Sequence, residues 1–106
     1  MSQSVFEALA DPHRRRLLGL VAVRERSAGE LAAEFGISRP AVSRHLRVLR
    51  EAGLVSRRGD AQRRLYRLDP APLNEITGWI EHTRDNWARR LDSLASHLDD
   101  LGNEDP

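Results

Sequence analysis

The spacing of apolar residues predicts helices over the first half of the chain. Up to Gly53, apolar side chains recur every three or four positions, which places them on one face of a helix. Asp11 followed by Pro12 is a typical helix start, because the carboxylate accepts hydrogen bonds from the first amide groups and proline fits the first helical position. Ser27 and Glu30 have the spacing of a capping box. We expect a short helix near residues 4–9, a second over 12–23 and a third from residue 27.

A tight turn should separate the third helix from a fourth. Gly36 suits the left-handed conformation that ends a helix, and Ser38 can cap the next one. On a helical wheel of the fourth helix, one face gathers Val42, Leu46 and Leu49, and the far side gathers Ser43, Arg44 and Arg47. Residues 27–53 therefore predict two helices joined by a turn. The second of them should have a buried face and a polar face that carries arginines.

After Gly53 the pattern changes to alternation. Residues 54–58 and 63–68 predict two strands joined through Gly59 to Gln62, with Val55, Tyr66 and Leu68 inward. A long helix should follow Pro70 and Pro72, over residues 73–101, with an apolar stripe. The expected fold is mainly α with a small β-hairpin: one winged helix-turn-helix domain over residues 1–106, with the wing at 54–68 and a long C-terminal dimerisation helix.

Charge is distributed unevenly along the chain. The net charge is only +1, but 14 Arg oppose 7 acids from Met1 to Leu68, and 3 Arg oppose 9 acids from there to the C-terminus. Such a basic segment is expected of a protein that binds a polyanion. The chain has no cysteine, which excludes disulfides, thiolate zinc sites and thiol nucleophiles. No apolar run approaches the roughly 18 residues of a membrane span, so we expect a cytoplasmic protein without membrane contact.

The candidate DNA contacts lie on the fourth helix and the hairpin. Arginine donates two hydrogen bonds to guanine, serine contacts a base or a phosphate, and a helix start favours a phosphate. We expect the N-terminal half of the helix to read bases and Arg47 and Arg50 to hold phosphates, while the hairpin enters the minor groove or contacts the backbone. His45 lies at the border of the buried face, where packing is the alternative to a DNA contact. The full candidate set is Ser38, Arg39, Pro40, Ala41, Ser43, Arg44, His45, Arg47, Arg50, Arg57, Arg58, Gln62, Arg63 and Arg64.

The apolar stripe of the last helix needs a partner. Left in water, it would be a large apolar patch, and pairing with the first and last helices of a second copy would cover it. A two-fold dimer would also present two recognition helices to half-sites about one DNA turn apart. The candidate interface residues are Val5, Phe6, Leu9, Ile80, Trp87, Leu91, Leu94 and Leu98.

Catalysis is not expected. Ser43, Arg44 and His45 are neighbours on one helix and diverge by about 100° per residue, so they cannot converge as a nucleophile and its base. No glycine-rich phosphate loop is present in the sequence either. We predict neither a cofactor nor a resident metal.

Four stretches of this sequence resemble the arsenic-repressor (ArsR/SmtB) family of bacterial regulators over roughly residues 3–72. The resemblance implies a homodimeric winged helix-turn-helix repressor that occupies an imperfect palindrome, with Val42 to Leu46 in its recognition helix. The stretch from Trp79 to Leu98 is similar to a branch without the metal-site cysteines, whose members are often autorepressors encoded beside a small lipid- or ligand-binding protein. The stretches are Asp11 to Leu18, Ser27 to Ala32, Ser38 to Leu49 and Ala52 to Val55.

Three alternatives remain at this point. His82 with Asp85 and His97 with Asp100 are each spaced i to i+3 and could supply metal ligands to a metal-responsive repressor, although Glu30 to Phe35 has no thiolate. Trp79 and Trp87 could instead hold a small effector. A winged-helix protein-interaction module is the third alternative, because the fold is also used without nucleic acid.

Overall fold

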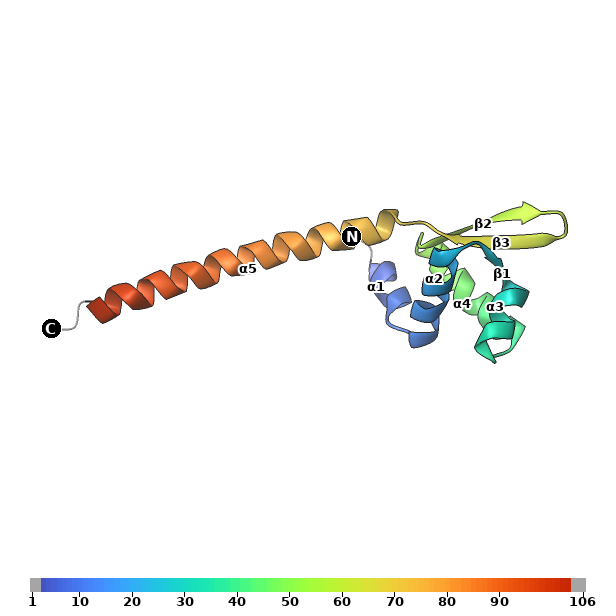
Figure 1. The fold of residues 1–106 in the computed structure, drawn as a ribbon, viewed down its shortest axis with the longest axis horizontal. Helices are drawn as coiled ribbons and strands as arrows, with labels where there is room; N and C mark the ends of the chain where they lie inside the picture. The colour runs from blue at the N-terminus through green and yellow to red at the C-terminus, as the bar shows by residue number, and fades with distance from the viewer. Residues whose placement is uncertain (1–2, 104–106) are drawn as a thin grey trace. The chain divides into compact units, whose positions relative to one another are not determined.

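The computed structural model describes residues 3–103 and contains five helices and three strands over that range (Figure 1). By its contacts the chain forms two units, Met1–Leu73 and Asn74–Pro106. The elements, in chain order, are α1 (Gln3–Leu9), α2 (Pro12–Val23), β1 (Arg26–Ser27), α3 (Ala28–Phe35), α4 (Arg39–Glu51), β2 (Val55–Asp60), β3 (Arg63–Leu68) and α5 (Ala71–Asn103).

Each predicted cap starts a helix. The Asp11 carboxylate accepts hydrogen bonds from the amides of His13 at 2.8 Å and Arg14 at 3.1 Å, at the N-terminus of α2. Ser27 Oγ accepts from the amide of Glu30 at 3.2 Å, and Ser38 Oγ accepts from the amide of Ala41 at 3.2 Å. These bonds satisfy amide groups that have no partner inside the helix, which is why α2, α3 and α4 begin where the sequence predicts.

The core of the first unit lies where α2, α3 and α4 meet. Gly36, with φ of 70°, ends α3 in the left-handed conformation, so α4 can turn back against it. The buried face of α4 is the predicted one, because Val42, Leu46 and Leu49 are all 0% exposed. The largest fully buried side chains are Leu17, Leu31, Leu46, Leu49, Leu54 and Val42.

The sheet has three strands in the order β1-β3-β2, all antiparallel, where the sequence predicts only a two-stranded hairpin. The missed strand, β1, consists of two residues, too few to show alternation. β2 also runs two residues further than predicted. Asp60 therefore pairs with Arg63 across a two-residue turn, in which Ala61 has φ of 56°, instead of across a four-residue loop.

Burial along β3 differs from simple alternation. Val55 and Tyr66 are buried as predicted, but Leu68 is only half-buried, and Leu65 is 8% exposed. Leu65 and Tyr66 are adjacent and so point to opposite faces of the strand. Both are covered because the sheet lies within the first unit, with α2 and α3 packed against β3.

Helix α5 runs from Ala71 to Asn103, two residues beyond the predicted range at each end, and its part from Asn74 onward belongs to the second unit. Its apolar stripe is exposed, with exposed fractions between 50% and 59%. No helix among residues 3–103 is long and apolar enough to cross a membrane. The exposed apolar residues of α5 are Trp79, Ile80, Trp87, Leu91, Leu94, Leu98 and Leu101.

Candidate nucleic-acid interface

The outer face of α4 carries the predicted polar side chains. Ser43, Arg44 and Arg47 are exposed, whereas Val42 and Leu46 are buried. Ser38, Arg39 and Pro40 are exposed at the start of the helix, Ala41 and His45 are half-buried at its flanks, and Arg50 is half-buried further along. The helix therefore presents serine and arginine to solvent over its whole length.

Strand alternation separates the wing, defined here as β2, β3 and their turn, into two faces. Arg57 pairs with Tyr66 across the ladder, and Gly59 pairs with Arg64. Arg58 pairs with Leu65 in the next position, so its side chain points to the other face. Arg57, Arg64 and Tyr66 therefore lie on one face of the wing.

That face of the wing turns toward α4. Four arginines and two hydroxyl side chains line a hollow of about 300 Å³, here called the α4–wing hollow. No carboxylate lines it. The lining residues are Ser43, Arg47 and Arg50 from α4 and Arg57, Arg64 and Tyr66 from the wing.

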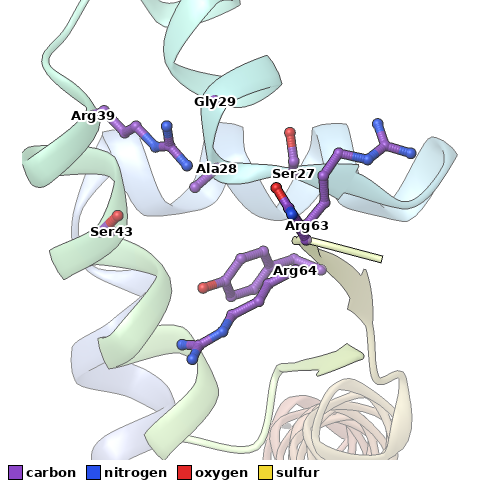
Figure 2. Close-up of a pocket in the computed structure, with 9 residues that line it drawn as sticks. Ser27, Ala28, Gly29, Arg39, Ser43, Arg63 and Arg64 are labelled. Atoms are coloured by element: carbon purple, nitrogen blue, oxygen red, sulfur yellow. The ribbon is translucent and has the colours of Figure 1, made fainter. Parts of the chain in front are cut away.

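A second hollow, of about 520 Å³, adjoins the first and shares Ser43, Arg64 and Tyr66 with it. Figure 2 shows Arg39 reaching from α4 toward Gly29 and Arg64 reaching from β3 toward α4. Its other lining residues are Ser27, Ala28, Gln62 and Arg63. Helix α4 and the wing thus form one continuous basic surface, as the sequence predicts for a DNA-binding protein.

The arginines of the first unit differ in whether they have partners. Arg58 Nε donates to Glu25 at 2.8 Å, and Arg63 contacts both Glu30 and Asp60 at 3.4 Å. Arg26, which is 8% exposed, pairs with Glu34. Among residues 3–73, the arginines that have no hydrogen bond, ion pair or ring contact are Arg39, Arg44, Arg47, Arg50, Arg57 and Arg64.

All six of these arginines lie on α4 or on the wing face that turns toward it. Like charges held together without counter-ions repel one another, so this surface is set to receive anions. Arg58 and Arg63, which sequence reasoning also includes among the DNA contacts, differ from the other arginines of this set in that carboxylates pair with them. Strand alternation is the signal that could have separated them.

Glu30 pairs with Arg63 of the wing and with Arg24. Desolvation raises the pKa of its carboxyl, but hydrogen bonds from the side chain and backbone of Ser27, followed by the contact with Arg24, outweigh it and hold the pKa below its usual value. The carboxylate therefore stays charged and contacts Arg24 and Arg63 at 3.4 Å each. It ties the tip of the wing, at Arg63, to the start of α3.

The predicted dimer residues fall into two groups. Val5 is 5% exposed and is already part of the core of its own unit, and Leu9 is half-buried, whereas Phe6 is 40% exposed. On α5, Ile80, Trp87, Leu91, Leu94 and Leu98 are all at least 50% exposed. The α5 residues are thus available to a partner, and Val5 adds little free surface.

The proposed metal ligands of α5 lie apart within one chain. His82 contacts the side-chain amide of Asn86 at 3.1 Å. Among residues 3–103, no three His, Cys, Asp or Glu side chains are grouped as a metal site would require.

The buried and exposed faces of α4, the turn before it and the basic wing define a winged helix-turn-helix of the DNA-binding class. Residues 11–57 match the sequence pattern of the family described as bacterial regulatory protein, arsR family. An HTH-type transcriptional regulator of Mycobacterium tuberculosis is 38% identical over 99 residues, which cover 93% of this chain and 90% of the relative. The chain belongs to the arsR family.

Further similarities agree with that membership. The transcriptional repressor SdpR of Bacillus subtilis is 35% identical over 77 residues, covering 73% of this chain and 86% of the repressor. A solution structure from Mycobacterium bovis, described as the homodimeric winged helix-turn-helix DNA-binding domain of a possible ArsR-family regulator, has a TM-score of 0.64. It is 28% identical, with 77% of this chain and 76% of that chain covered. The protein is a transcriptional regulator and not an enzyme.

Proposed function

We propose that two copies of this chain bind an inverted repeat in a promoter and repress transcription by occupying it, with α4 in the major groove and the wing against the adjacent backbone. The observation that carries the proposal is the position of the six unpartnered arginines, all on α4 or on the wing face beside it. The family and the relative named as a repressor support regulation by DNA binding. Because bacterial promoters lie in the cytoplasm, the protein would act there.

Within α4, exposure supports a division of roles. Ser43 and Arg44 lie in the N-terminal half of the helix and are exposed, so in the major groove they would reach base edges. Arg47, Arg50, Arg57 and Arg64 surround the α4–wing hollow and would hold the phosphate backbone. Arg58 and Arg63 would contribute mainly through the ion pairs that support the wing.

Dimerisation rests on the exposed stripe of α5. Seven large apolar side chains on one helix, each at least half exposed, are more apolar surface than a single helix keeps in water. The solution structure from Mycobacterium bovis is described as homodimeric, which supports the same assembly here. Two-fold pairing would place two copies of α4 at half-sites about 34 Å apart, one turn of DNA.

The proposal is tested by selecting fragments of the organism's own genome with the purified protein, its own promoter included. We expect enrichment of a fragment with an inverted repeat, and a protected footprint that overlaps a promoter. Binding to random duplex should weaken steeply between 50 and 200 mM salt, because each phosphate contact releases counter-ions (about −0.9 in slope per contact). No enrichment, together with flat salt dependence, would instead indicate a protein-interaction module.

A further inference from the structure

Tyr66 combines burial with access to both hollows. Its side chain lies opposite Arg57 in the β2–β3 ladder and is 7% exposed, as expected of a core residue. It nevertheless lines the α4–wing hollow and the neighbouring one. Among residues 3–103, no group forms a hydrogen bond with its hydroxyl. The hydroxyl is not among the buried, unpaired side-chain atoms of the described residues, so it opens into the hollows, where a ligand could accept its hydrogen bond.

The charges around that hydroxyl define what the ligand must be. Arg47 and Arg50 reach the hollow from α4, Arg57 and Arg64 reach it from the wing, and none of the four has an acidic partner among the described residues. Planar guanidinium groups suit the oxygens of a phosphate, each of which accepts several hydrogen bonds. A phosphate is therefore the ligand chemistry that satisfies the four cations and the phenol together.

We propose that the α4–wing hollow is the binding site of one phosphate group of the DNA backbone, here called the phosphate site, and that Tyr66 donates a hydrogen bond to one of the phosphate oxygens. This inference rests on the DNA binding proposed above and identifies the residues of one backbone contact. Tyr66 is a packing residue by its burial and a DNA-binding residue by its hydroxyl. The phosphate site lies between α4 and the wing, so one phosphate would fix the position of both elements on the duplex.

The source of the phosphate distinguishes two ligands. A phosphodiester of DNA and a free phosphate or pyrophosphate offer the same oxygens to the four arginines. The hollow adjoins a second one, which shares Ser43, Arg64 and Tyr66 and is also lined by Arg39 and Arg63. This basic surface therefore continues beyond a single anion, as a DNA strand requires and a small free anion does not.

The first test compares three variants by fluorescence anisotropy with a random duplex over a range of salt concentrations. Tyr66→Phe keeps the ring and removes the hydroxyl, so we expect about tenfold weaker binding with an unchanged salt slope, since a hydrogen bond to a charged group is lost but no charge. Arg57→Gln should weaken binding and also reduce the slope by about 0.9, because one phosphate contact is lost.

Arg58→Gln is the matched control. It makes the same chemical change at the adjacent residue of the same strand, but its side chain points to the other face and pairs with Glu25. We expect a clearly smaller loss of affinity than for Arg57→Gln. The thermal unfolding midpoint of every variant shows whether it is folded. Equal losses of affinity for the two arginine variants, or wild-type affinity for Tyr66→Phe, would contradict the proposed phosphate site.

The second test separates the two sources of phosphate. Inorganic pyrophosphate, titrated at constant ionic strength, should compete with the duplex only at millimolar concentrations, and to a similar degree in wild type and in Arg57→Gln. Replacing single phosphates of the duplex by neutral methylphosphonates should weaken wild type at one position and have little effect there on Tyr66→Phe. Tight, saturable pyrophosphate binding that Arg57→Gln abolishes would assign the hollow to a free anion instead.

The two proposals fail in different ways. If the wild-type protein binds neither random nor selected duplexes, both the proposed function and the proposed phosphate site are wrong. If the wild-type protein binds DNA with a steep salt dependence, and Tyr66→Phe and Arg57→Gln both have its affinity and salt slope, only the proposed phosphate site is wrong.

Discussion

The imidazole ring of His45 stacks on that of His13, with the ring centroids 5.7 Å apart and the planes at 30°. His13 is in the first turn of α2, so this contact joins α2 to the flank of α4. His13 also lies 5.7 Å from the ring of Phe35, and the guanidinium of Arg16 lies 4.5 Å from the centroid of that ring. The cluster fixes α4 against α2 on the side away from the wing hollow.

His45 should therefore act through packing. Replacing His45 by Ala removes the stacked ring, and we expect a loss of about 1 kcal/mol of stability, which lowers Tm by roughly 5 °C. The affinity of the folded protein for DNA should change less than twofold. Thermal unfolding by circular dichroism and anisotropy at 10 °C measure the two effects. A variant with unchanged Tm and strongly weakened DNA binding would make His45 a direct contact.

Arg44 should behave in the opposite way. Its side chain is exposed on the outer face of α4 and lines neither hollow, so it is free to reach a base. We expect Arg44→Ala to weaken binding to the selected operator by about 1–3 kcal/mol, and binding to scrambled duplex by clearly less, if its contact is bidentate to guanine. Tm should be unchanged.

Arg67→Ala is the control for that prediction. Arg67 is also exposed, but it lies on the opposite face of the wing and donates to Ser56 at 3.1 Å. We expect it to bind operator and scrambled duplex nearly as the wild type does. Equal losses on both duplexes for Arg44→Ala would reassign Arg44 to the backbone.

The helices could be predicted from the sequence because their signals are local. Asp11, Ser27 and Ser38 cap the helix that each immediately precedes, and the three- and four-residue spacing fixes the buried face of α4. The arrangement of the wing depends on strand pairing between distant residues, which the pattern indicates only weakly. For that reason the sequence does not predict β1, and it predicts a four-residue turn where the structure has two residues.

The sequence predicts the general position of the candidate site, but not which of its arginines pair with carboxylates. The sequence identified the arginine-rich surface, but it could not show that Glu25 and Glu30 hold Arg58 and Arg63, since each pair is separated by 33 positions in the chain. Tyr66 was predicted only as an inward residue. Its second role depends on where α4 lies relative to β3, which no local pattern records.

The carboxyl group of Asp11 should make the stability of the protein depend on pH. Desolvation raises the pKa of its carboxyl, but hydrogen bonds from the amides of Arg14 and His13 outweigh it, so the pKa lies below the ordinary 3.8. A lowered folded-state pKa means that the cap stabilises the protein fully above about pH 3.8 and loses this contribution as the pH falls through the lower value. The difference in Tm between wild type and Asp11→Ala should therefore be constant near neutral pH and shrink under acid conditions.

Asp11→Asn serves as the control, because asparagine also caps helices but does not titrate. The difference in Tm between Asp11→Asn and Asp11→Ala should change much less with pH between 3 and 7. If the Tm difference between wild type and Asp11→Ala did not shrink at low pH, the charged carboxylate would not be the form that stabilises α2.

Leu91 lies near the middle of the exposed stripe of α5 and is 59% exposed. In the proposed dimer it is buried between two copies, so Leu91→Asp would place a charge in an apolar interface, which costs several kcal/mol. We expect monomers in sedimentation equilibrium at micromolar concentration, and operator binding weakened at least tenfold because the two half-sites are no longer bound together. Ser93→Asp adds the same charge to the same helix outside the stripe and should remain dimeric. A Leu91→Asp protein that stayed dimeric would move the interface away from α5.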